Sequence, residues 1–120
     1  MIKKICVLED DEGIREIIEL LLSEESYEVH GFSNVSDFIV AYSSAGADLF
    51  LLDVRLPDGN GIDVCGRVKE NPQTRNIPVL MMSAHSSKNE IENNSLADGF
   101  ITKPFDIYTF ISRINDTLSL

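Results

Sequence analysis

Short apolar runs recur along the chain, separated by stretches in which apolar residues return every three or four positions. The runs are rich in Ile, Val, Leu and Phe, so they predict short strands buried within a sheet. One run alternates polar and apolar residues and predicts a more exposed strand. The five predicted strands are Lys3–Glu9, the alternating run Tyr27–Phe32, Leu49–Leu52, Ile77–Ser83 and Gly99–Thr102.

Between these runs, the apolar residues fall on one face of a helix. The first helix is expected at Glu12–Ser23, with Asp10 or Asp11 as its amino-terminal cap, and the second begins after Ser33 or Asn34. The apolar anchors are Ile14, Ile17, Ile18 and Leu21 in the first helix, Val35, Phe38, Ile39 and Tyr42 in the second, Ile62, Cys65 and Val68 in the third, and Ile107, Phe110, Ile111, Ile114 and Leu118 in the last.

Strand and helix alternate five times, with short linkers between them. Ser86–Asn94 contributes the fourth helix, which we expect to be short or frayed because Ile91 is almost its sole apolar anchor. Such alternation predicts parallel strands joined by right-handed crossovers, with helices on both faces of one sheet. The expected fold is therefore an α/β, doubly wound parallel sheet, formed by residues 1–120 as a single domain.

Charge and composition narrow the function classes. The formal net charge of -10 would repel phosphates, so we expect no direct binding of nucleic acid and favour proteins or a cation as partners. No run approaches the ~20 apolar residues of a membrane span, and acids follow the first run too soon for a secretory signal. Cys6 and Cys65 lie in apolar stretches, which indicates buried free thiols rather than a disulfide or a metal site and fits a reducing cytoplasm.

Polar residues stand where four of the predicted strands end. In a doubly wound sheet these ends lie side by side at the topological switch point, where such folds bind ligands. Carboxylates crowded there would raise one another's pKa unless a cation joined them, and Mg²⁺ accepts a few carboxylates together with waters and phosphate. The residues concerned are Glu9 and Asp10 after the first strand, Asp53 after the third, Ser83 on the fourth and Lys103 after the fifth.

Together these side chains suit phosphoryl transfer. A carboxylate beside Mg²⁺ can attack phosphorus and form an aspartyl phosphate, for which Asp53 is the candidate. Lys103 would supply a second cation, and Ser83 a hydrogen bond to a phosphoryl oxygen. Taken singly, each residue has an ordinary alternative: Asp53 as a helix cap or solvated acid, and Glu9 and Asp10 as favourable charges at a helix amino terminus. Their convergence on one sheet edge favours the functional interpretation.

Four segments resemble the receiver domain of two-component response regulators: VLEDDEGIR near the start, LFLLDVRLPDGNG in the middle, PVLMMSAH on the fourth predicted strand and FITKPF on the fifth. The resemblance runs over the whole chain. It implies a flavodoxin-like (βα)5 fold with strand order 2-1-3-4-5, phosphorylated on aspartate by a sensor histidine kinase. It also implies that the chain is not an enzyme for an external substrate and assists only its own phosphorylation and dephosphorylation.

The resemblance assigns roles position by position. It makes Asp53 the phosphoacceptor. It makes Glu9 and Asp10 the acidic pair for Mg²⁺, with the backbone carbonyl of Arg55 as a further ligand. Lys103 would pair with the phosphoryl group. The implied cofactor is therefore Mg²⁺.

Residues around this centre would respond to phosphorylation or change the rate of dephosphorylation. By the same resemblance, Ser83 contacts the phosphoryl group and Phe100 falls at the switch aromatic position. The Lys103–Pro104 bond is expected to be cis. Arg55 and His85, two residues after Asp53 and Ser83 respectively, flank the path of attacking water, so we predict that their side chains modulate dephosphorylation. The alternative is that both are solvated loop residues.

The resemblance also implies partners. A sensor histidine kinase or a histidine phosphotransfer protein would supply the phosphoryl group in a phosphorelay, and a downstream protein target would receive the signal. The fourth helix, fifth strand and fifth helix form the family's usual output face, where a homodimer could pair. The sequence leaves open whether the chain is a free-standing regulator or a receiver from a longer protein.

Two other functions suit the same fold. A Mg²⁺-dependent phosphohydrolase with an aspartyl-phosphate intermediate would need a second acid two residues after the nucleophile, where this chain has Arg55, and a cap domain for which the chain is too short. A flavin-binding electron carrier would need hydroxyls and free amides in the first loop, but that loop, EDDEGI, is acidic. The phosphohydrolase is therefore the main alternative to the receiver domain.

Overall fold

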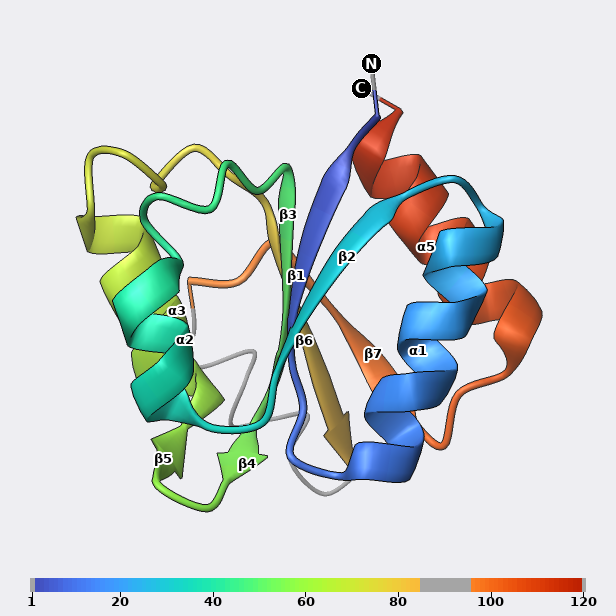
Figure 1. Ribbon diagram of the computed structural model, residues 1–120, viewed down its shortest axis with the longest axis horizontal. Coiled ribbons are helices and arrows are strands. Elements are labelled where there is room, and N and C mark those ends of the chain that lie inside the picture. The colour runs from blue at the N-terminus through green and yellow to red at the C-terminus, as the bar shows by residue number, and fades with distance from the viewer. Residues whose placement is uncertain (1, 85–95, 120) are drawn as a thin grey trace.

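The computed structural model describes residues 2–84 and 96–119. Five parallel strands form a sheet in the order β2-β1-β3-β6-β7, as Figure 1 shows. Counted along the chain, these five strands have the order 2-1-3-4-5, so the predicted fold class is confirmed. They are β1 (Lys4–Leu8), β2 (Glu28–Phe32), β3 (Leu49–Asp53), β6 (Val79–Ala84) and β7 (Gly99–Lys103).

Helices cover both faces of the sheet. In Figure 1, α2 (Val35–Ala41) and α3 (Gly61–Glu70) lie on one side, and α1 (Glu12–Glu24) and α5 (Ile107–Leu118) lie on the other. From β1 the chain winds first to β2, and from β3 it winds the other way to β7. The carboxyl ends of β1 and β3 are therefore neighbours at the topological switch point, the usual ligand position in this architecture.

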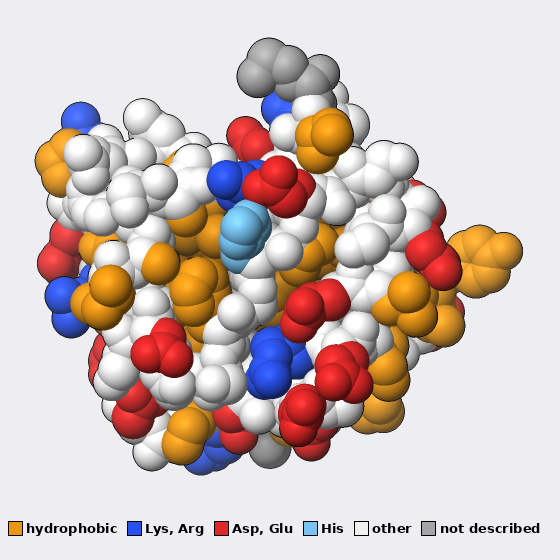
Figure 2. Space-filling model, in the orientation of Figure 1, with side chains coloured by type: hydrophobic (Ala, Val, Ile, Leu, Met, Phe, Trp, Pro, Cys, Tyr) orange, Lys and Arg blue, Asp and Glu red, His pale blue; other side chains and the backbone are white. Residues whose placement is uncertain are grey.

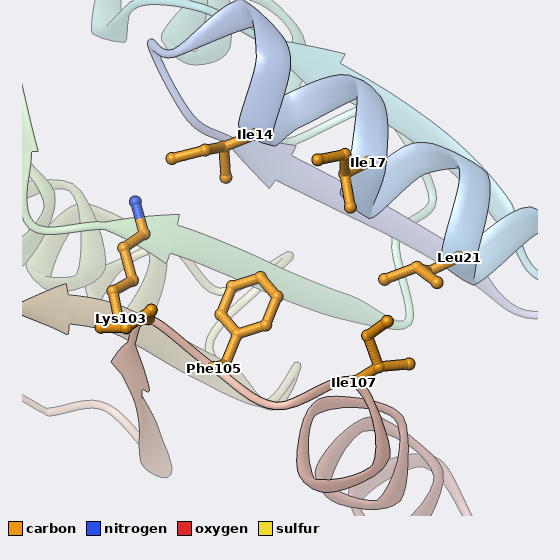
Figure 3. A pocket seen from close by; sticks show the side chains of 7 residues that line it. Ile14, Ile17, Leu21, Lys103, Phe105 and Ile107 are labelled. Atoms are coloured by element: carbon orange, nitrogen blue, oxygen red, sulfur yellow. The ribbon is translucent and has the colours of Figure 1, made fainter.

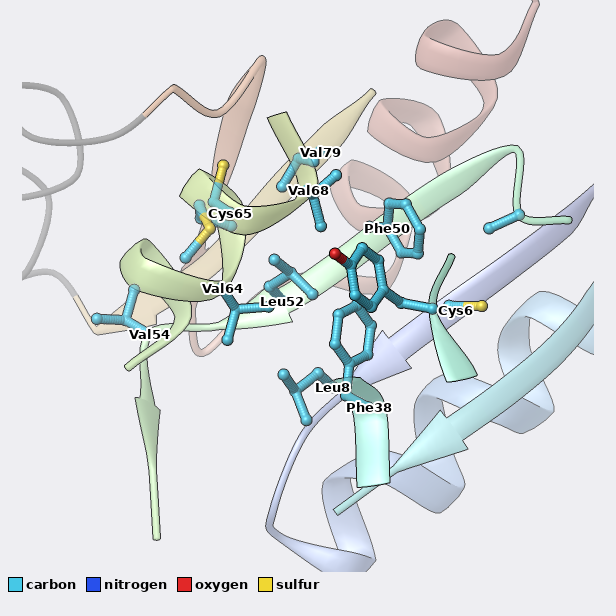
Figure 4. Close-up of a cluster of buried hydrophobic side chains, with 13 residues drawn as sticks. Cys6, Leu8, Phe38, Phe50, Leu52, Val54, Val64, Cys65, Val68 and Val79 are labelled. Atoms are coloured by element: carbon cyan, nitrogen blue, oxygen red, sulfur yellow. The ribbon is translucent and has the colours of Figure 1, made fainter. Parts of the chain in front are cut away.

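Each side of the sheet has its own apolar core. On the side of α2 and α3, Phe38 stacks on Tyr42 with ring centroids 5.4 Å apart and meets Phe50 edge to face (Figure 4). Cys6 and Cys65 belong to this cluster, and both are buried and outside any disulfide of the described residues, as predicted. The opposite core joins the other faces of the strands to Ile18 and Leu22 of α1 and Phe110 and Ile114 of α5.

Side-chain caps fix where two of the predicted helices begin. Asp11 Oδ1 accepts a hydrogen bond from the Ile14 amide at 2.9 Å, so Asp11 rather than Asp10 caps α1. Asn34 Oδ1 accepts from the Asp37 amide at 2.8 Å and caps α2. In both cases the structure chooses between two alternatives that the sequence left open.

The helical spacing predicted more burial than the structure shows at two positions. Ile17 and Ile107 were expected to pack with their neighbours, but their side chains are 55% and 56% exposed. Spacing places a residue on one side of a helix but does not say how far the neighbouring elements extend over that side. These two residues instead face a groove that is described below.

The connection after β3 contains a small antiparallel hairpin. Pro57, Gly59 and Gly61 disfavour regular structure, but β4 (Arg55–Leu56) and β5 (Gly59–Asn60) pair there. The predicted helix Ser86–Asn94 lies outside the described residues. Within residues 2–84 and 96–119, no helix has the length and apolarity to cross a membrane.

Candidate functional site

Three acids meet at the carboxyl edge of the sheet. Glu9 follows β1 directly, Asp53 ends β3, and carboxylate oxygens of Glu9, Asp10 and Asp53 all lie within 4.8 Å of one another. Glu9 and Asp53 are buried, with 1% and 8% exposure, whereas Asp10 is exposed. The structure therefore brings together the three predicted acids, in a cluster that opens to solvent at Asp10.

Lys103, the last residue of β7, spans this cluster. Its Nζ donates hydrogen bonds to Oδ2 of Asp53, at 3.1 Å, and to Oε1 of Glu9. Because β6 lies between β3 and β7 in the sheet, the lysine side chain reaches over the end of β6 to contact both acids. The peptide bond from Lys103 to Pro104 is cis, as expected.

The electrostatics of the site reflect its excess of acids. Burial raises the pKa of Glu9, and the neighbouring Asp53 raises it further, against the opposing effect of Lys103. Burial alone would lower the pKa of Lys103, but its hydrogen bonds and attraction to Glu9 and Asp53 raise it above its ordinary value. When all three carboxylates are ionised, the Lys103 ammonium group balances one of their negative charges. Among these four described side chains two negative charges remain, which matches the charge of a divalent cation.

Ser83 brings a buried hydroxyl to the same edge. The residue lies on β6, between the strands that carry Asp53 and Lys103, and is 2% exposed. Its Oγ has no hydrogen-bond partner in the described part of the chain. Since a buried hydroxyl without a partner costs free energy, this atom is suited to receive a ligand. Carboxylates, a hydroxyl and an ammonium group together fit Mg²⁺ and a phosphoryl group.

Close packing holds the segment that leaves Asp53. The Gly61 amide donates to the Val54 carbonyl at 2.8 Å, and Asn60 Oδ1 accepts from the Ile62 amide at 2.7 Å. Arg55 pairs with Asn60 across the hairpin, and its side chain is exposed. The segment thus returns tightly from the end of β3 to the start of α3.

Two further predicted positions have different outcomes. Phe100 is in β7, in register with Met81 of β6, and packs half-buried against the core on the side of α2 and α3. It therefore lies within the sheet, three residues before Lys103. His85 lies outside the described residues.

An apolar groove of about 400 Å³ borders the acid cluster. Figure 3 shows side chains from α1 facing those from the segment after β7, with Lys103 at one end. Figure 2 shows acidic side chains beside the hydrophobic ones over α1. The sequence predicted Ile14, Ile17, Leu21 and Ile107 on apolar helix faces and Lys103 at the phosphoryl site, and did not predict a groove between them. The lining residues are Ile14, Ile17, Leu21, Lys103, Pro104, Phe105 and Ile107.

Comparison with known proteins agrees with this geometry. The family model for the response regulator receiver domain matches residues 5–115. The chain is 28% identical over 120 residues to the phosphate regulon transcriptional regulatory protein PhoB of Rhizobium meliloti, covering 98% of this chain and 53% of that protein. The chain thus spans about half the length of the curated relatives that it matches. A phosphohydrolase finds no support among these matches.

Solved structures are similar over nearly the whole chain. The non-phosphorylated HemR receiver domain from Leptospira biflexa is 30% identical with a TM-score of 0.86, over 98% of this chain and 95% of that one. The response regulator TrrA from Thermotoga maritima, solved in complex with Mg(2+)-BeF, is 25% identical with a TM-score of 0.87, over 98% of this chain and 100% of that one.

Proposed function

Because this chain belongs to the family of receiver domains of two-component response regulators, we propose that Asp53 accepts a phosphoryl group from a phosphohistidine. The observation that carries the proposal is the arrangement around Asp53: Glu9 and Asp10 within 4.8 Å, and Lys103 bonded to both Asp53 and Glu9. A solvated loop acid or a helix cap needs none of these partners.

The chemistry follows from the positions of these groups. An oxygen of Asp53 would bond to phosphorus while the bond from phosphorus to the donor's imidazole nitrogen breaks, with the electron pair returning to that nitrogen. Mg²⁺ held by Glu9, Asp10, Asp53 and the Arg55 carbonyl would supply positive charge to the transferring group. Lys103, already bonded to Asp53, would pair with a phosphoryl oxygen.

Ser83 and Phe100 would couple this chemistry to a change of shape. The Ser83 hydroxyl, which has no partner among the residues that the structure describes, would gain a phosphoryl oxygen as partner and move toward it. Phe100 would then move into the vacated space. The change would present a different surface to the downstream protein target or to a second copy at β7 and α5. Identical Phe100 rotamers in the resting and phosphorylated proteins would contradict this part.

The side chain of Arg55 would tune how long the phosphoryl group persists. It is exposed and stands two residues beyond Asp53, in the first strand of the hairpin. A bulky cation there would obstruct the approach of water, and we extend the same role to His85 by its position. Phosphoryl lifetimes of Arg55→Ala and His85→Ala, compared with the parent, test both assignments, and unchanged lifetimes would remove them.

The phosphodonor would dock over the groove beside α1. A donor histidine must approach Asp53 closely, so the protein that carries it has to cover the surface around the site. Lys103 belongs both to the acid cluster and to the groove, which makes the two continuous. The exposed apolar side chains of Ile17 and Ile107 would then be buried by a sensor histidine kinase or a phosphotransfer protein, in the cytoplasm.

The central experiment is phosphorylation by a small donor. Parent protein and Asp53→Ala are incubated with Mg²⁺ and acetyl phosphate, and the intact mass of each is measured. We expect one phosphoryl adduct on the parent and none on the variant. An adduct on the variant, or no adduct on a parent that binds Mg²⁺, would contradict the proposal.

A further inference from the structure

We propose that Asp58 is a positioning residue for the metal site, an inference that rests on the Mg²⁺ binding included in the proposed function. Asp58 lies at the tip of the β4–β5 hairpin, and its carboxylate bonds to the start of α2, more than 20 residues earlier in the chain. Its Oδ1 accepts from the Val35 amide at 2.8 Å. Its Oδ2 accepts from the Ser36 amide at 3.0 Å and from the Ser36 hydroxyl at 2.8 Å.

These bonds divide the capping of α2 between two residues from different parts of the chain. Asn34 accepts from the Asp37 amide, whereas Asp58 takes the amides of Val35 and Ser36. The bonds lower the pKa of the Asp58 carboxyl, so it stays ionised and accepts all three donors near neutral pH. The hairpin also lies close to α2 at Gly59, because a Cβ added to Gly59 would lie only 3.0 Å from a methyl group of Val35.

The bonds from Asp58 to α2 matter because the hairpin contains Arg55. Its first strand begins at Arg55, whose backbone carbonyl we assign to Mg²⁺. The hairpin is fixed at its base by the Gly61 amide on the Val54 carbonyl, and at its tip by Asp58 on α2. Arg55 lies between these two points, so the bonds on either side of it restrain the position of its backbone. Without Asp58 the tip is released, and ordering the Arg55 carbonyl would then cost free energy each time the metal binds.

A purely structural role is the alternative, in which Asp58 stabilises α2 and affects the metal no more than any other cap would. Asn34 provides the matched control. Asn34→Ala removes a capping bond from the same helix end but leaves the bonds between the hairpin and α2 in place. Comparing the two variants therefore separates loss of helix stability from loss of hairpin position.

The experiment measures Mg²⁺ affinity by isothermal titration calorimetry on the unphosphorylated protein, together with urea unfolding. We expect Asp58→Ala to raise the Kd for Mg²⁺ by about 10-fold, the lower end of losses seen when a residue supporting a ligand is removed. Asn34→Ala should unfold at lower urea than the parent but keep the parent's Kd. Asp58→Asn, which keeps one acceptor oxygen, should fall between parent and Asp58→Ala.

The possible results separate the positioning role of Asp58 from the proposed function of Asp53. A Kd for Asp58→Ala equal to that of the parent, or an equal rise in Asn34→Ala, overturns the positioning role and leaves the proposed function intact. A parent that binds no Mg²⁺ overturns both. Normal Mg²⁺ binding with no phosphoryl adduct on Asp53 overturns only the proposed function.

Discussion

A Cβ atom on Gly61 would lie 1.9 Å from the backbone carbonyl oxygen of Asp53. Gly61 is the first residue of α3 and is buried, so this helix begins against the backbone of the candidate phosphoacceptor. A contact this short requires the absence of a side chain rather than an unusual backbone angle. The position of Asp53 is thus fixed by the pairing of β3 within the sheet and by the close packing of the start of α3 against its backbone.

We expect Gly61→Ala to destabilise the protein by about 1 to 3 kcal/mol or more, because the added methyl group must displace backbone that cannot rotate away. The same displacement should reduce phosphorylation of Asp53 by acetyl phosphate. Urea unfolding and intact mass measure the two effects. The control is Gly66→Ala in the same helix, where a Cβ meets nothing within 4 Å. That variant should be neutral or more stable by up to about 1 kcal/mol, and equal losses in both variants would contradict the steric argument.

Ser83→Ala should separate stability from function. Its Oγ is buried with no hydrogen-bond partner in the described part of the chain, so removing it should leave the free energy of unfolding unchanged or slightly higher. Phosphorylation should still be slower, since a phosphoryl oxygen loses its hydroxyl partner. Thr74→Val is the matched control, because Thr74 is buried and its hydroxyl donates to the Val68 carbonyl at 2.8 Å. It should cost about 1 to 3 kcal/mol. A similar cost for Ser83→Ala would show that this hydroxyl is already bonded.

Local patterns predicted the sheet and the polar residues at its edge, because strands and helices of this fold differ in period. They could not predict the hairpin of β4 and β5, because each of its strands has two residues, too few to show a period. The bonds from Asp58 to α2 join segments that are distant in the sequence, so the residues next to Asp58 do not predict them. The exposure of Ile17 was missed for a related reason, since it depends on how far the segment after β7 extends over α1.

Replacing Lys103 should change how the protein responds to Mg²⁺. Lys103→Met leaves the buried Glu9 and Asp53 without their shared cation, so the metal-free protein should unfold at a lower temperature. Mg²⁺ should then raise the melting temperature of the variant more than that of the parent, because Lys103 no longer competes for the same oxygens. Thermal unfolding with and without Mg²⁺ measures this difference.

Lys69 offers the control for that experiment. Its Nζ pairs with Asp98 at 2.9 Å and also donates to the Ile77 carbonyl, at the other end of the sheet from the acids. Lys69→Met should lower the melting temperature equally with and without Mg²⁺. If Mg²⁺ stabilises Lys103→Met no more than it stabilises the parent, competition between lysine and metal is ruled out.

The Cys6 thiol should resist modification in the folded protein. Burial raises its pKa from 9.0 to about 11, so at about pH 8 the reactive thiolate is scarce as well as inaccessible. This shift contributes stability below pH 9 that is lost as the pH rises through the folded value of about 11. In Cys65→Ala, which isolates Cys6, labelling by a thiol reagent should be slow under native conditions and fast in urea. Equal rates in both conditions would show that Cys6 is not buried.

The groove beside α1 should be needed for protein phosphodonors but not for small ones. Ile17→Asp places a charge on a side chain that is 55% exposed, so the fold and phosphorylation by acetyl phosphate should persist. Transfer from a phosphorylated histidine kinase or phosphotransfer protein should fall by about 10-fold or more, because a buried unpaired carboxylate in that interface costs more than 1.4 kcal/mol. Val40→Asp, 83% exposed on α2, is the control and should transfer normally. If both variants transfer as fast as the parent, the partner docks elsewhere.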